Sequence, residues 1–221
     1  MSPTDQFLKA QKAIAKMATE YLWVGIILLM LFLTWYYRRQ INKKANDNYA
    51  MESIYNNKDT VIGNINSADA KYKMDVVNGT GCLRDYYIAS SYNSCCAGDF
   101  QDGYVDLVPL REVIHQGARV LDFALYQVDG EPVVAAGPSD SDNIKGTYNS
   151  VPVGGNEGIL STINKYAFSL PTPNPTDPLF IHFRVKSKVN PRLFYKKLTN
   201  YVNQYCGSRL LDPAYGYEGR P

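Results

Sequence analysis

Three segments decide the fold: Ala89-Ser-Ser-Tyr-Asn-Ser-Cys-Cys-Ala-Gly-Asp-Phe100, Gly117-Ala-Arg-Val-Leu-Asp-Phe-Ala-Leu-Tyr126 and Glu131-Pro-Val-Val-Ala-Ala-Gly137. An apolar run over residues 86–91 leads into the first. A second run, over residues 120–128, is rich in β-branched and aromatic residues. These runs predict strands, and the third segment predicts another strand. Polar residues stand where the first two strands are expected to end.

A helix is expected between the first two strands. Leu107, Leu110 and Ile114 recur at helical spacing, and Val113 widens their apolar face. Gly117 stands where a left-handed C-terminal cap belongs. Strand, helix and strand joined by short turns predict a parallel βαβ unit.

The sequence after residue 137 predicts a loop, a helix, a strand and a second helix. The polar, Gly-rich residues 138–155 form the loop, and Asn156 is expected to cap the first helix. Residues 179–185 form the strand, and Asn190-Pro191 opens the last helix, with Gly207 beyond its end. The apolar faces of the two helices are Ile159, Leu160, Ile163 and Ala167, and Phe194, Leu198, Tyr201, Val202 and Tyr205.

The number of strands bears on the architecture. About four parallel strands are half of a closed eight-stranded α/β barrel of the TIM type. Such a sheet exposes an edge unless it curls, is capped or pairs with another chain. We therefore expect an α/β, half-barrel-like parallel sheet over residues 84–207, completed by a partner protein or a second copy, and an irregular tail over residues 208–221.

Charge and cysteine content exclude several classes of protein. The chain has 221 residues and a net charge of +2, which gives no basic stripe for nucleic acid. Four cysteines are too few for a disulfide scaffold. Cys95 and Cys96 are adjacent and cannot act as the two arms of a metal clip, so we expect free thiols and neither a metal nor a cofactor.

Residues 21–37 form a run of seventeen without a charge. As a helix the run is roughly 26 Å long, near the lower limit for a bilayer span. A core helix is rarely apolar all round, and a signal peptide has small residues at its cleavage site, so an anchor is favoured over both. Aromatic and basic residues expected at the membrane interfaces are Tyr21, Trp23, Trp35, Tyr36, Tyr37, Arg38 and Arg39.

The segments on either side of the run are polar. Residues 1–20 place lysines on one face and apolar residues on another, as in an interfacial helix. Residues 38–83 form a connector, which is either a helix with a stripe through Ile54, Val61 and Ile65 or a partly ordered stalk. The positive charges slightly favour a cytoplasmic location for the C-terminal domain of a single-pass protein.

The segments of the domain resemble the X region of phosphatidylinositol-specific phospholipase C, in order, over about residues 84–206. Ser91-Tyr92-Asn93 matches the family's Ser-His-Asn, and Gly117-Ala118-Arg119 followed by Asp122 matches its Gly-x-Arg and acidic residue. Pro132-Val-Val-Ala-Ala-Gly137 matches the segment that ends in His-Gly. Three shorter motifs, Ser-Tyr-Asn-x-Cys, Gln-Gly-x-Arg-Val-Leu-Asp-Phe and His-Phe-Arg-Val-Lys-Ser, also resemble phospholipase-like proteins of large double-stranded DNA viruses.

The resemblance implies a degenerate site. The family's two catalytic histidines correspond to Tyr92 and Ala136, and tyrosine is a poor base at neutral pH while alanine transfers no proton. The calcium ligands of the family correspond to Asn93, Asp122, Ala124 and Arg184, of which the last two cannot bind calcium.

The residues themselves leave several structural roles open. Asp122 is expected to be the buried partner of either Arg184 or Arg119, and His182 to be a hydrogen-bonded, packed strand residue. The predicted function is that of a catalytically inactive, membrane-anchored interaction protein. If the viral resemblance holds, it is a minor capsid or membrane protein of a virion whose domain faces the capsid. The alternative is a membrane phosphodiesterase or a module that binds lipid headgroups or other anions.

Overall fold

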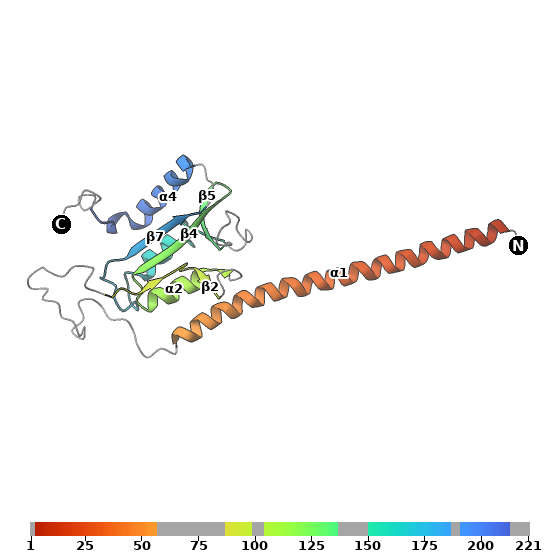
Figure 1. Ribbon diagram of the computed structural model, residues 1–221, viewed down its shortest axis with the longest axis horizontal. Helices are drawn as coiled ribbons and strands as arrows, with labels where there is room; N and C mark the ends of the chain where they lie inside the picture. The colour runs from red at the N-terminus through yellow and green to blue at the C-terminus, as the bar shows by residue number, and fades with distance from the viewer. Residues whose placement is uncertain (1–2, 57–86, 99–103, 137–149, 187–190, 213–221) are drawn as a thin grey trace, which may run out of the picture. The chain divides into compact units, whose positions relative to one another are not determined.

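A computed structural model of the protein describes residues 3–56, 87–98, 104–136, 150–186 and 191–212, and it contains two compact units, Met1–Asn46 and Asp47–Pro221 (Figure 1). The first unit is helical. The second unit is mixed α/β, with a curled, half-barrel-like sheet.

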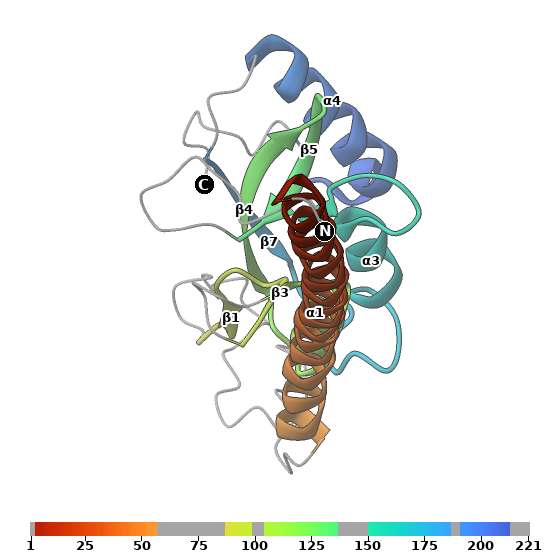
Figure 2. The same ribbon diagram turned by 90° about the vertical axis from the view of Figure 1, so that its right-hand side faces the viewer.

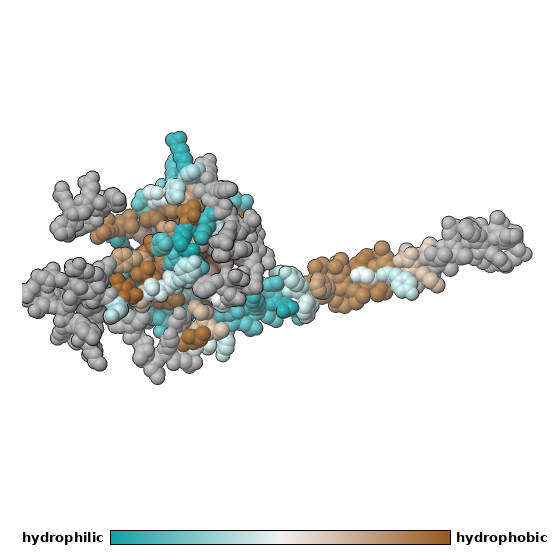
Figure 3. Space-filling view, in the orientation of Figure 1, coloured by the Kyte–Doolittle hydropathy of each residue, from teal (hydrophilic) through white to brown (hydrophobic). Residues whose placement is uncertain are grey.

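Helix α1 (Pro3–Asn56) is a single continuous helix of 54 residues. It continues without a break through the segment boundaries expected near residues 20 and 37, so the first part of the connector is helical. No proline or glycine interrupts residues 38–56, which is consistent with a continuous helix. The rest of the connector lies outside the described residues. Among the described helices, α1 is the one long and apolar enough to cross a membrane, and Figure 3 shows its hydrophobic band. At the end of this band the Arg39 guanidinium carbon lies 5.5 Å from the Trp35 ring centroid.

Strand β4 (Val120–Val128) is the centre of the sheet. It pairs in parallel with β1 (Ser90–Ser91) along one edge and with β7 (Phe180–Val185) along the other. Further along β4, residues Leu125–Val128 pair antiparallel with β5 (Glu131–Ala135). Strand β5 in turn pairs antiparallel with β6 (Ser150–Pro152). A separate antiparallel ribbon, β2 (Cys96–Ala97) with β3 (Tyr104–Val105), follows the first strand.

The expectation of an all-parallel sheet is therefore wrong for the third strand. Asp129 and Gly130 both have positive φ, 50° and 79°, between the paired residues Val128 and Glu131. Positive φ at both central residues is the geometry of a tight two-residue hairpin turn, which Asp-Gly favours. The chain consequently reverses at this point instead of crossing over.

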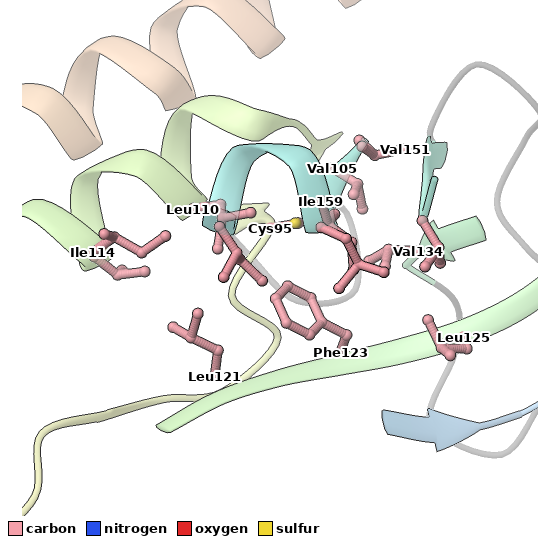
Figure 4. Packing of buried hydrophobic residues seen from close by; sticks show 14 of the residues in the cluster. Cys95, Val105, Leu110, Ile114, Leu121, Phe123, Leu125, Val134, Val151 and Ile159 are labelled. Carbon is pink, nitrogen blue, oxygen red and sulfur yellow. The ribbon is translucent and has the colours of Figure 1, made fainter. Parts of the chain in front are cut away.

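The core lies on one face of the sheet. Leu121, Phe123 and Leu125 of β4 are fully buried and point toward buried residues of the helices that cover this face (Figure 4). These helices are α2 (Leu107–His115), α3 (Ile159–Tyr166) and α4 (Pro191–Cys206), and Figure 2 shows α3 and α4 on the same side. Burying each large side chain contributes roughly 1.5–3 kcal/mol. The alternate residues of β4 and β7 lie on the other face.

The predicted helices are confirmed, with one change. Gly117 follows α2 with a φ of 89°, as expected of a C-terminal cap. Helix α4 begins at Pro191, and Gly207 follows its last residue. Helix α3 is capped by Gly158 and not by Asn156. Residue 158 has to be a glycine, because a Cβ there would lie 2.3 Å from the backbone oxygen of Gly154.

Candidate functional site

The candidate site lies on the sheet face opposite the core. In the β4–β7 register Asp122 is paired with His182, and Ala124 with Arg184. Side chains alternate along a strand, so these four residues share one face. The segment after β1 carries Tyr92 and Asn93; hydrogen bonds place Asn93 at this face, and a cation–π contact with Arg184 places Tyr92 there.

The centre of the site is an ion pair between Asp122 and Arg184. Arg184 Nε donates to Asp122 Oδ1 at 2.9 Å and to Oδ2 at 3.1 Å, and Nη2 donates to Oδ2 at 2.6 Å. The Asp122 side chain is 9% exposed and that of Arg184 is 21% exposed. Of the two predicted partners of Asp122, Arg184 is thus confirmed. Arg119 instead donates from Nε to Asn174 Oδ1 at 3.0 Å.

Asn93 and Ser94 hold the end of β1 against Asp122. Asn93 has a φ of 47°; its backbone N–H donates to Asp122 Oδ2 at 3.2 Å, and its side-chain oxygen accepts from Arg184 Nη2. The Ser94 N–H donates to the Asp122 carbonyl at 2.8 Å, and the Asp122 N–H donates to Ser94 Oγ at 3.1 Å. A left-handed asparagine is favoured in a turn of this kind.

His182 belongs to the site; it is hydrogen-bonded, as expected, but contrary to expectation it is not packed within its strand. Its Nδ1 lies 2.7 Å from Asp122 Oδ1, while 64% of its side chain is exposed. The two-residue spacing between His182 and Arg184 is the sequence signal for this placement, since residues two apart on a strand share a face. A histidine oriented by a buried carboxylate is a common arrangement in proton-transfer sites.

The ionised form of Asp122 is stabilised. Burial raises the pKa of its carboxyl group, but hydrogen bonds from Arg184, from the Asn93 N–H and from His182 outweigh burial and hold the pKa below its ordinary value. The hydrogen bonds from Arg184 to Asp122 raise the pKa of the guanidinium. Burial raises the pKa of the neighbouring Cys96 thiol to about 11, so this thiol is neutral at pH 7.

Tyr92 covers the guanidinium from the solvent side. The Arg184 Cζ lies 4.5 Å from the centroid of the Tyr92 ring, and the tyrosine remains 60% exposed. Ala124 packs in a small cluster with Tyr126, Val133 and Ala135. Ala136, the other expected pocket residue, is a member of the main core cluster.

The oxygens of Asp122 and Asn93 are already bound by protein groups. Asp122 Oδ1 receives two contacts and Oδ2 receives three, and Asn93 Oδ1 also accepts from Arg184. These are the oxygens that a calcium ion would need, and a cationic side chain already binds them. Of Asp122, Arg184 and His182, only His182 has a mainly exposed side chain.

No family model matches the chain, and no curated protein matches it. Among solved structures, the chain is similar to two phospholipase C structures, PLC21 of L. pealei (23% identity, TM-score 0.46) and PLC21 of S. officinalis (24% identity, TM-score 0.46). Each match covers 63% of this chain and 16% of the other, so the chain spans a small part of these enzymes. Likeness at this level establishes neither a family nor an activity for the chain.

Proposed function

We propose that this chain is a single-pass, membrane-anchored interaction protein whose α/β domain does not hydrolyse phosphodiesters. The observation that carries the proposal is the position of Arg184, which binds the oxygens of Asp122 and Asn93. A guanidinium in this position repels a divalent cation. The apolar helix α1, with its aromatic ends, supplies the anchor.

Proton transfer is the second requirement of the reaction. Cleavage of a phosphodiester by an internal hydroxyl needs a base for the attacking oxygen and an acid for the leaving oxygen, and each contributes about 10²–10⁴-fold. Tyr92 and Ala136 stand at the two positions where the resembled family has histidines. A lone His182 therefore leaves at least one of the two roles unfilled.

The His182–Asp122 contact favours one other function, a hydrolase with a single proton-transfer residue. Nδ1 of His182 is held by a carboxylate and its ring is exposed, which is the orientation of a general base. We rank this function second because no partner acid is present among the site residues and because Arg184 already neutralises Asp122.

The full chain purified in detergent is expected to show no calcium-stimulated cleavage of phosphatidylinositol above a no-enzyme control. The His182→Ala and Tyr92→Ala variants should both behave like the parent, and an active phospholipase C serves as the positive control. Turnover that disappears in His182→Ala would reject the proposal in favour of the hydrolase, and the Tyr92→Ala variant would show whether the tyrosine is its acid.

A more specific role, the attachment of an internal viral membrane to a capsid, is part of the proposal and rests on the sequence resemblance alone. The partners would then be capsid proteins, and the α/β domain would face the capsid. Quantitative mass spectrometry of purified particles tests this role. We expect a fixed stoichiometry to the capsid protein, and absence from the particles would exclude it.

A further inference from the structure

The outer edge of β7 presents backbone groups for pairing. Phe180 N–H donates to the Arg119 carbonyl at 2.8 Å, and Lys186 N–H donates to the Leu125 carbonyl at 2.9 Å. The even-numbered residues of β7 therefore bond to β4. By alternation, the N–H and C=O groups of Ile181, Phe183 and Val185 point away from β4. Within the described ranges, β4 is the one strand that pairs with β7.

The two faces of this edge differ in character. Ile181, Phe183 and Val185 lie on the core face and are only partly buried, whereas their register partners on β4 are fully buried. The apolar layer of the core thus continues to the edge of the sheet. An added strand with apolar residues at alternate positions would extend this layer.

The other face of the edge is cationic. His182, Arg184 and Lys186 occupy successive positions on it, spaced two residues apart. The carboxylate of Asp122 contacts the first two, and Lys186 forms no ion pair with any described residue. Edge strands often carry cations that discourage pairing with similar strands, and the same charges favour a strand that carries carboxylates.

We propose that the free edge of β7 binds an extended segment of a partner protein in which acidic and apolar residues alternate. The inference rests on the proposed interaction function and specifies its partner. The segment adds to the sheet as a further strand, with main-chain hydrogen bonds to Ile181, Phe183 and Val185. One of its carboxylates lies beside His182 and another beside Lys186, because residues four apart are separated by about 13 Å on both strands.

Asp122 illustrates how a carboxylate fits this face. Its Oδ1 lies 2.7 Å from His182 Nδ1 and 2.9 Å from Arg184 Nε, so one carboxylate bridges two neighbouring basic side chains of the stripe. On an added strand, one acidic side chain would approach the exposed side of His182, and another would approach the ammonium of Lys186. Exposed pairs of this kind contribute mainly to specificity and to the rate of association.

The test is fluorescence anisotropy of a labelled peptide of about eight residues, alternating glutamate and valine, added to the full chain in nanodiscs of neutral lipid. We expect saturable binding that weakens about tenfold in the His182→Gln/Lys186→Gln variant. The matched control, Arg192→Gln/Lys196→Gln on the exposed face of α4, removes charge elsewhere and should change the affinity less than about twofold. A peptide N-methylated at the amides that face β7 should lose binding, because strand addition needs these donors.

Several results would overturn the proposal. These are absence of peptide binding, equal binding of the N-methylated peptide, and an equal loss in the α4 control. A peptide-free dimer that the peptide dissociates would assign the edge to a second copy. Binding of the peptide only after Asp140→Asn/Asp142→Asn, which removes two carboxylates of this chain, would assign the edge of β7 to the segment that carries these two residues. The phosphatidylinositol assay does not depend on this edge, so the two proposals fail separately.

Discussion

Replacing Arg184 with methionine is expected to lower the free energy of unfolding of the α/β domain by about 3–5 kcal/mol at neutral pH. Methionine keeps much of the volume but leaves the carboxylate of Asp122, with its side chain 9% exposed, without its main partner. The hydrogen bond from the Asn93 N–H and the contact with His182 remain. An uncompensated buried charge costs more than the intact pair contributes, so the single variant is the severe one.

The pH dependence identifies the cause of this loss. The pKa of Asp122 is depressed in the folded protein, so the pair stabilises the fold above the unfolded value of about 3.9, and the contribution is lost as the pH falls through the folded pKa. The deficit of Arg184→Met relative to the parent should therefore be largest at neutral pH and shrink in acid. The Asp122→Asn/Arg184→Met variant should recover most of the stability at neutral pH. Equal stabilities of the single and double variants would contradict the buried-charge explanation.

Replacing Phe123 with alanine is expected to cost about 3–5 kcal/mol, because the ring is fully buried between β4 and the helices that cover it. The ring also packs against Phe183, with 6.1 Å between the ring centroids. Phe180, at the start of β7, is 39% exposed and is the matched control. Its replacement by alanine should cost less than about 1.5 kcal/mol.

Both stability experiments need a signal from the α/β domain alone. The two tryptophans of the chain, Trp23 and Trp35, lie in α1, so tryptophan fluorescence reports the wrong unit. Near-ultraviolet circular dichroism of the tyrosines, most of which lie outside α1, is followed during urea unfolding in nanodiscs, and the same measurement on the isolated α1 segment in nanodiscs is subtracted. Equal losses for Phe123→Ala and Phe180→Ala would contradict the placement of the core on one face of β4.

The helices and most strands could be predicted because each is a local pattern. The spacing of Leu107, Leu110 and Ile114 and the glycine after them specify α2 without reference to other elements. The direction of β5 depends on the turn at Asp129 and Gly130, which makes β5 antiparallel to β4. The strand–helix–strand pattern earlier in the chain had suggested a parallel strand. Local turn chemistry was the available signal.

The candidate site could be predicted only in part. The sequence places an acidic residue, Asp122, and a basic residue, Arg184, on two strands of the sheet. It does not distinguish Arg184 from Arg119 as the partner of Asp122, because the choice depends on the register between β4 and β7. The place of His182 depends on that same register, which sets it beside Asp122 across the two strands. Periodicity gives the face of a residue within its own strand, and the register between strands decides which residues meet.

In the function that we propose, Arg184 takes the place of a metal ion at Asp122 and Asn93. Isothermal titration of the full chain in detergent with calcium, up to about 1 mM, tests this claim most directly. We predict no saturable binding by the parent and none by Asp122→Asn. One-to-one binding by the parent that Asp122→Asn abolishes would contradict the claim.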